Sequence, residues 1–286
     1  MRILYALLRY RYLEMSQIHH LFFAGQSLQN AYRIIKKLHD RRLIQKSEIP
    51  RQPNLKMGAF IYLTDRGCNM LVSDSGFSAK ELGYKRIVYP LESPNHAYHR
   101  KRMIDLYLNL DQALEDSPLQ LRSMTMDYEK EVINGRRVSL NKLENKTGQI
   151  NIIPDLIAVL HHPSKKTERV LMIEIDSAKE TIGGADRLGM VPRHSLLDKY
   201  LRYEAILHDR SWQQKVSTSV KAFEVLTITE TVRHIRTIQK QSQGHLQFPH
   251  LFHCATHKAI VQGNLLKDSL WYNLKAPFEA RLLFHH

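Results

Sequence analysis

The sequence predicts an α/β (α+β) protein of two domains, residues 1–90 and residues 91–286, and three observations support this. Helical and strand-like hydrophobic patterns succeed one another, with a helix-rich beginning and a strand-rich remainder on either side of a proline-bearing stretch near residue 90. The composition is globular, with 43% hydrophobic and 24% charged residues. The positive charge is concentrated in the first domain, which indicates that the two domains have different tasks.

The chain of 286 residues carries 42 Lys and Arg against 28 Asp and Glu, a formal net charge of +14. The first domain holds 15 of the basic and 6 of the acidic residues (+9), and the second holds 27 and 22 (+5). Such a surplus favours a polyanionic partner, and nucleic acid fits it better than an anionic membrane surface. With no apolar run near the roughly 18 residues that span a bilayer, and only Cys68 and Cys254 as cysteines, we expect a soluble cytoplasmic protein without a membrane partner.

Three helices followed by a ribbon of strands are expected in the first domain. The first helix covers residues 2–13, the second has Ser16 as its N-cap, and the third follows Ser27 over residues 28–42. In the third helix apolar residues recur at i, i+3, i+4 and i+7, which indicates one buried stripe. A polar turn and a strand that begins at Phe60 come next. This order is that of a winged helix-turn-helix, a fold that commonly binds duplex DNA.

The opposite face of the third helix and the wing carry the expected DNA contacts. The amide side chains in the first turn can read base edges, and the long cationic side chains can reach phosphates. The predicted DNA-binding residues are Gln29, Asn30, Arg33, Lys36, Lys37, Arg41, Arg51 and Lys56. A solvated basic face and a protein-binding winged helix are the alternative interpretations of the same pattern.

The second domain is expected to follow the order α-β-β-β-α-β-α-β. The expected elements are a helix over 96–115, strands over 119–132, 150–160 and 169–176, a helix over 186–208, a strand over 223–229, a helix over 231–241 and a strand over 250–256, with a loop over 134–150. The strands over 150–160 and 169–176 are almost continuously apolar, as in a sheet covered on both faces.

Three carboxylates are expected to meet at one edge of this sheet. Side chains alternate along a strand, so Glu174 and Asp176 point to the same face, and Asp155 follows Pro154 on the neighbouring strand. Oxygen ligands suit hard divalent cations and leave positions for phosphate and water. We therefore expect Asp155, Glu174 and Asp176 to bind Mg²⁺ or Mn²⁺. Taken singly, each residue is better explained as a polar strand edge or turn, and the metal site is favoured only by the three together.

The run Pro154-Asp155 followed by Glu174-Ile175-Asp176 resembles the PD-(D/E)xK nuclease signature, and the order of elements resembles the αβββαβ core of restriction-endonuclease-like domains. This sequence departs from the signature at one point, because Asp176 stands where the motif has a lysine that supports the charge of the transition state. Lys199 on the following helix is expected to replace it. The catalytic residues implied are Asp155, Glu174, Asp176 and Lys199. His96, His99, Glu180 and Tyr203 are expected beside them, with surface or core positions as the alternative.

The whole chain resembles the replication-relaxation family, which includes the MOBC-type relaxases of mobilisable plasmids and integrative elements. The segments that carry the resemblance are RYRYLEMSQIHHLFF, FIYLTDRG, the pair PD and EID, DKYLRY, LFHCATHK and LWYN. It implies a metal-dependent endonuclease that nicks DNA at a transfer or replication origin of a mobile element. The implied partners are double-stranded origin DNA, single-stranded DNA after nicking, and accessory proteins of a relaxosome. The chain contains no H-x-H motif, which excludes the histidine-cluster mechanism of other relaxases.

Two other functions fit the same residues. One is a non-catalytic DNA-binding regulator of replication or transcription with a degenerate nuclease fold, because the motif lysine is missing. The other is a double-strand-cutting defence nuclease, which would require a dimer. The sequence leaves open the oligomeric state, and also whether water or a tyrosine attacks the phosphate, with Tyr200 and Tyr203 near Lys199.

Overall fold

The computed structural model describes residues 1–47, 58–87, 94–133, 135–176, 182–183, 195–275 and 277–284. Contacts within the chain divide it into two units, Met1–Tyr107 and Leu108–His286. The division falls inside helix α5 (Pro94–Glu115), whereas the sequence predicted a boundary before this helix. Among the described residues, no helix is both long and apolar enough to cross a membrane.

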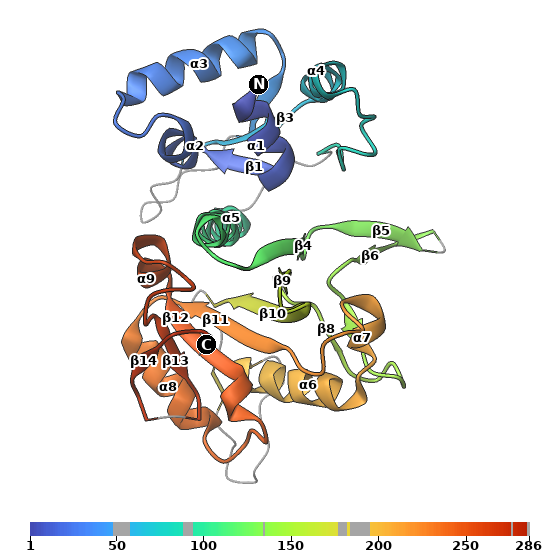
Figure 1. Ribbon diagram of the computed structural model, residues 1–286, viewed down its shortest axis with the longest axis vertical. Coiled ribbons are helices and arrows are strands. Elements are labelled where there is room, and N and C mark those ends of the chain that lie inside the picture. The colour runs from blue at the N-terminus through green and yellow to red at the C-terminus, as the bar shows by residue number, and fades with distance from the viewer. Residues whose placement is uncertain are drawn as a thin grey trace. The chain divides into compact units, whose positions relative to one another are not determined.

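The first unit combines helices with a small antiparallel sheet (Figure 1). Its elements are α1 (Arg2–Tyr10), β1 (Tyr12–Glu14), α2 (Met15–Phe22), α3 (Leu28–Asp40), β2 (Ile44–Ser47), β3 (Phe60–Leu63) and α4 (Asp65–Ser75), followed by the first part of α5. The three strands pair in the order β1-β3-β2. Strand β1 was not predicted, and its three residues are held in place by pairing with β3.

The helix starts in this unit follow from side-chain capping. As predicted, the Ser27 hydroxyl accepts a hydrogen bond from the amide of Asn30 and begins α3, which buries Ala31 and Ile35. The prediction for α2 was wrong by two residues. Its N-cap is Glu14 rather than Ser16, because Glu14 and Gln17 satisfy each other's backbone amides in a capping box.

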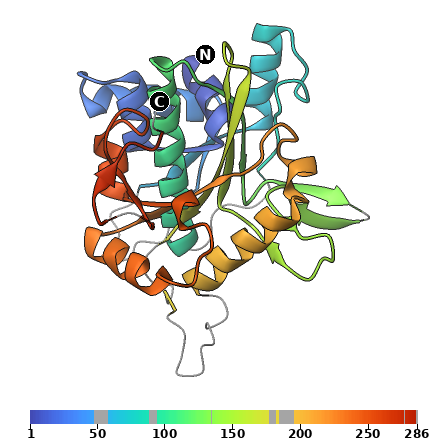
Figure 2. The ribbon, with the colours of Figure 1, turned by 60° about the horizontal axis from the view of Figure 1, so that its bottom comes forward.

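The second unit is built on a seven-stranded mixed sheet (Figures 1 and 2). After the end of α5, its elements are β4 (Gln120–Met126), β5 (Lys130–Ile133), β6 (Arg136–Ser139), β7 (Leu143–Glu144), β8 (Asn151–Ile152), β9 (Leu156–His162), β10 (Thr167–Ile175), α6 (Leu196–Asp209), α7 (Trp212–Lys215), β11 (Glu224–Thr229), α8 (Val232–Ser242), a 3₁₀ turn (Pro249–Leu251), β12 (Phe252–Thr256), α9 (His257–Gln262), β13 (Trp271–Asn273) and β14 (Ala280–Arg281). The strand order is β14-β13-β12-β11-β10-β9-β4, with β10, β11 and β12 parallel and the other neighbours antiparallel. The chain is therefore a mixed α/β protein.

Helices α6 and α8 cover one face of this sheet and form its main core. The buried residues are Val170, Met172, Val225 and Cys254 from the strands, Leu196, Tyr200, Tyr203 and Ile206 from α6, and Ile235 and Ile238 from α8. Because side chains alternate along β10, Glu174 lies on the same face as Val170 and Met172, as the sequence predicted, and therefore points towards α6. Both cysteines, Cys68 and Cys254, are buried free thiols.

The region before β9 differs most from the prediction. The expected loop over 134–150 contains β6 and β7, and the expected strand over 150–160 is interrupted between β8 and β9. Pro154 causes the interruption, because it has no amide hydrogen to donate to a neighbouring strand. Asp155 lies between this interruption and the first residue of β9. The C-terminal elements α9, β13 and β14 were not predicted.

Candidate functional site

Asp155 lies at the point where β9 begins, and hydrogen bonds fix it from both neighbouring strands. Its carboxylate Oδ2 accepts a hydrogen bond of 2.7 Å from the amide of Ile175, the last residue of β10. Its carbonyl oxygen accepts one of 2.9 Å from the amide of Asp127, directly after β4. The side chain of Asn141, fully buried, donates to the carbonyl of Pro154 at 2.9 Å. Asp155 is therefore held rigidly at the shared ends of β4, β9 and β10.

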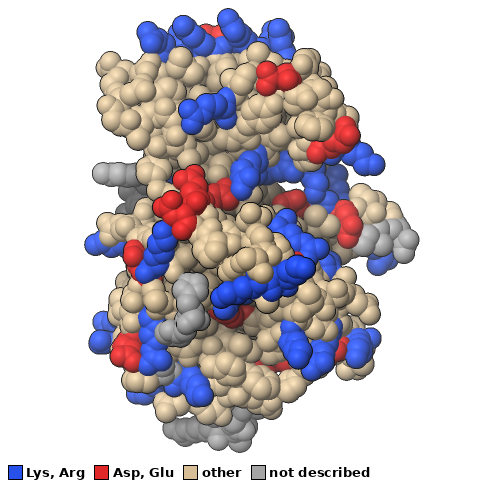
Figure 3. All heavy atoms as spheres, viewed as in Figure 1, with Lys and Arg blue, Asp and Glu red and all other residues tan. Residues whose placement is uncertain are grey.

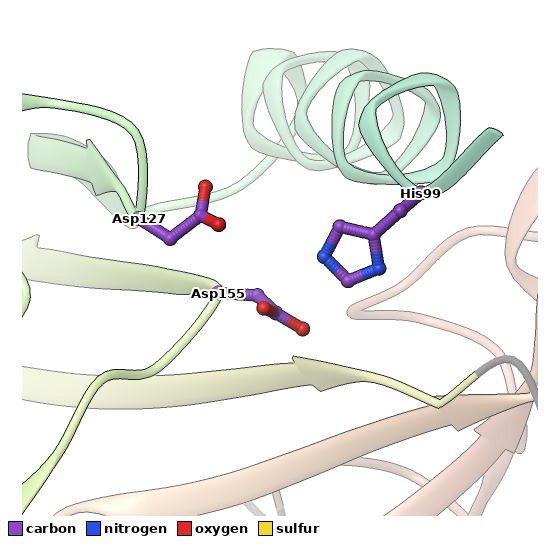
Figure 4. Close-up of side chains that lie close together, drawn as sticks. All are labelled: His99, Asp127 and Asp155. Carbon is purple, nitrogen blue, oxygen red and sulfur yellow. The ribbon is translucent and has the colours of Figure 1, made fainter. Parts of the chain in front are cut away.

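Two further groups offer ligand atoms next to Asp155. One atom each from His99, Asp127 and Asp155 lies within 4.8 Å of the others, and all three residues are partly buried (Figure 4). His99 was expected near the site. Asp127 was not, because only the register of β4 on β9, with Met126 opposite Leu156, places it beside Asp155. This set of close ligand atoms, found among the described residues, does not include Glu174 or Asp176.

Glu174 is buried under α6, where two side chains of that helix contact it. The Tyr203 hydroxyl donates a hydrogen bond of 2.6 Å to Oε1, and the Lys199 ammonium lies 3.5 Å from Oε2. Burial, together with the charge of Glu174, raises the pKa of Tyr203 well above its ordinary value. The structure thus brings together three residues that the sequence assigned to one site. The side chain of Lys199 is 32% exposed, so it can also reach a ligand from solvent.

Asp176 lies one residue beyond β10 and turns towards α8 and the end of β11. Its Oδ2 lies 2.7 Å from Nε2 of His234 and accepts a hydrogen bond of 3.3 Å from the Thr229 hydroxyl. Asp176 is buried, and the side chain of His234 is 16% exposed. The sequence missed His234, and no spacing signal links it to Asp176, since it comes from a helix that follows another strand.

The remaining predicted site residues are placed as follows. His96 is exposed near the start of α5 and does not join the close ligand atoms described above. Glu180, Arg51 and Lys56 lie outside the described residues. The other expected DNA contacts lie on α3, where Gln29, Arg33, Lys36 and Lys37 are exposed and Arg41 follows the helix. Figure 3 shows Lys and Arg side chains gathered along α3.

Asn30 is more constrained than its neighbours on α3. Its side-chain amide donates to Gln26 at 2.6 Å, and its oxygen accepts from Arg33 at 2.9 Å. These bonds hold the Arg33 guanidinium at the first turn of the helix.

The fold and these contacts define a mixed α/β protein in which acidic side chains gather where neighbouring strands end. A sequence model of the replication-relaxation family matches residues 4–220, well over half of the chain. The chain belongs to the replication-relaxation family, which indicates a role in replication or mobile-element biology. No curated protein matches the chain significantly, and no solved structure does.

Proposed function

We propose that this protein is a metal-dependent endonuclease of the relaxase type, which nicks DNA at a transfer or replication origin of a mobile element. One observation carries the proposal. The Asp155 carboxylate accepts a hydrogen bond from the backbone amide of Ile175, the residue after Glu174, and Glu174 forms an ion pair with Lys199. An acidic pair at adjacent strand ends with a lysine beside it is the arrangement that the PD-(D/E)xK signature requires. The lysine comes from α6 instead of from position 176.

The first unit supports recognition of duplex DNA. We propose that it is a winged helix with α3 as the recognition helix, and the order α1-β1-α2-α3-β2-β3 and the antiparallel pairing β1-β3-β2 support this. The exposed polar and basic side chains of α3 would contact base edges and phosphates.

The chemistry of the ligand atoms fits a divalent cation. Asp155 and Asp127 supply carboxylate oxygens, and His99 on α5 supplies an imidazole nitrogen. Carboxylates suit Mg²⁺ and Mn²⁺, and an imidazole ligand is the usual partner of transition-metal ions, which favours Mn²⁺ of the two. When bound, the ion would neutralise phosphate charge and lower the pKa of a coordinated water.

The chain's own residues would orient the phosphate and stabilise its charge. Lys199 would approach a phosphate oxygen from α6 and offset negative charge that develops during cleavage. Tyr203 would hold Glu174 in one rotamer. Tyr200 and Tyr203 do not suit the role of nucleophile, because both are buried and burial raises the pKa of each well above its ordinary value. We therefore propose attack by water rather than by a tyrosine.

The test is a nicking assay on supercoiled plasmid that carries the candidate origin, with Mg²⁺, Mn²⁺ or EDTA. We expect conversion to open circle only with metal and only with the origin. Glu174→Gln should abolish nicking while duplex binding, measured by fluorescence anisotropy, stays within about twofold of wild type. Glu224→Gln is the matched control, because Glu224 is a largely buried carboxylate at the opposite end of the neighbouring strand β11, and it should nick normally.

Other outcomes would overturn the proposal in distinct ways. Tight binding without a nick under any metal would indicate a DNA-binding regulator. Linear product from concerted cuts would indicate a double-strand nuclease. Nicking by Glu174→Gln at the wild-type rate would show that the site has been assigned wrongly.

A further inference from the structure

The hairpin of β5 and β6 is separate from the seven-stranded sheet. Within the part of the chain that the structure describes, its two strands pair only with each other, with Lys130 opposite Ser139 and Val132 opposite Arg137. In Figure 1 it extends past the end of β4, away from the seven-stranded sheet. Val132, at 70%, is the most exposed large hydrophobic side chain among the described residues.

The register of the hairpin separates its charges between two faces. Residues opposite each other in an antiparallel pair share a face, so Lys130, Val132, Arg137 and Ser139 lie on one side. Glu131 lies on the other side together with Arg136, the neighbour of Arg137 in sequence. One face therefore carries two cations and no acid, whereas charges on the other face compensate. Among the residues that the structure describes, no acidic group pairs with Lys130 or Arg137.

Hydrogen bonds join the base of the hairpin to the backbone of the segments that carry Asp127 and Asp155. The Ser139 hydroxyl, at the inner end of this face, donates to the carbonyl of Asp127 at 2.9 Å. The amide of Leu140 donates to the carbonyl of Glu129 at 2.8 Å and closes the base of the hairpin. Asn141 then bonds to the Pro154 carbonyl, next to Asp155. These hydrogen bonds fix the base of the hairpin beside Asp127 and Asp155.

We propose that the hairpin of β5 and β6 is a DNA-binding arm. The face formed by Lys130, Val132 and Arg137 contacts the DNA that the proposed site cuts. The inference rests on the proposed function, because it is the nearness of the carboxylates that identifies the bound polyanion as substrate DNA. The two cations contact phosphates, and the exposed Val132 packs on sugar or base surface between them. A two-stranded ribbon is narrow enough to enter a groove of the duplex.

Photocrosslinking tests the contact without using cleavage as its readout. The full chain carrying Val132→p-benzoylphenylalanine is irradiated with origin DNA in EDTA, and the covalent adduct is detected on a denaturing gel. We expect an adduct from position 132. The control is Val261→p-benzoylphenylalanine, another exposed valine, on α9, which should give no adduct.

Substitution of the two neighbouring arginines tests which face is used. Arg137→Ala should weaken DNA binding about threefold to tenfold and lower the slope of log affinity against log salt by about 0.7–0.9. Arg136→Ala removes the same charge from the opposite face and should leave both quantities at wild-type values. Equal losses for the two variants would contradict the assignment of the face.

The failure of this inference can be told apart from that of the proposed function. Origin-specific nicking without an adduct at position 132 overturns the DNA-binding arm alone. An adduct at position 132 in a protein that nicks no DNA with any metal overturns the proposed cleavage and retains the arm as a DNA contact. An adduct between two copies of this chain in place of DNA overturns the choice of occupant.

Discussion

The hydroxyl of Tyr203 donates a hydrogen bond of 2.6 Å to Oε1 of Glu174, and both residues are buried. One helical turn earlier, Lys199 lies 3.5 Å from the other oxygen of the same carboxylate. Helix α6 therefore holds Glu174 through two side chains at spacing i, i+4, and leaves the strand end no freedom to turn the carboxylate away. These two contacts fix the orientation of the Glu174 carboxylate.

Tyr203→Phe should lower both stability and nicking. It leaves a buried carboxylate without one donor, which costs about 1–3 kcal/mol in the free energy of unfolding, measured in urea. The rate of nicking should fall because Glu174 gains rotamers. Tyr200→Phe is the matched control. Its hydroxyl bonds to Thr227 at 2.7 Å and not to a carboxylate, so it should lose stability while nicking remains. Equal nicking by the two variants would contradict the positioning role of Tyr203.

Lys199→Ala should reduce the single-turnover nicking rate by about 10²–10³-fold, the usual effect of removing one group that stabilises transition-state charge. Binding to origin DNA should change by less than about twofold, since binding depends mainly on phosphate contacts elsewhere. Arg202→Ala removes a cation from the same helix that is paired with Asp198 at 3.0 Å, and serves as the control. If the two substitutions slow nicking alike, Lys199 has no special role.

Asp176→Asn should have little effect on metal affinity, whereas Asp155→Asn should lower it strongly. Since Asp176 bonds to His234 and Thr229, its substitution should leave Mn²⁺ affinity, measured by titration calorimetry, within about threefold of wild type. Asp155→Asn should weaken that affinity by more than tenfold, because Asp155 contributes to the group of close ligand atoms. A large loss of affinity in Asp176→Asn would restore Asp176 as a ligand, as the sequence pattern suggested.

What the sequence revealed depended on how local each signal was. The cap at Ser27 and the stripe through Ala31 and Ile35 predicted α3, because caps and periodicity act within a few residues. Apolar runs likewise predicted β9 and β10 and placed Glu174 on its face. The role of Asp127 could not be predicted, because it depends on how β4 pairs with β9.

His234 shows the same limit in the site. It reaches Asp176 from a helix that is 58 residues further along the chain, and only the packing of α8 on the sheet brings the two together. Sequence order thus predicted Asp155, Glu174 and Lys199 as neighbours, since they come from consecutive elements. It could not show that Asp176, two residues after Glu174, would turn to a different partner.

Gly67→Ala should destabilise the first unit by about 1–3 kcal/mol or more. A Cβ at this position in α4 would lie 2.1 Å from the carbonyl oxygen of Leu43 and 2.6 Å from a methyl of Leu63, and the backbone atom has no room to move away. Met70→Ala, at an exposed position of the same helix, should change stability by less than about 0.5 kcal/mol. Thermal unfolding of the two variants measures the difference, and equal melting temperatures would show that α4 can shift.

Glu224→Gln should make the protein more stable above neutral pH. Burial raises the pKa of Glu224 to about 7 although Arg169, at 3.2 Å, opposes the shift. The folded state therefore binds the proton more tightly than the unfolded state does, so this contribution to stability is complete below about pH 4.5 and is lost as the pH rises through about 7. Wild type should lose on the order of 2–3 kcal/mol relative to Glu224→Gln across that window.

Urea unfolding between pH 4 and pH 9 measures this difference in stability, with the exposed Glu279→Gln as a control that should follow wild type. Parallel curves for wild type and Glu224→Gln would show that Arg169 and His253, 3.6 Å away, keep the carboxylate ionised throughout.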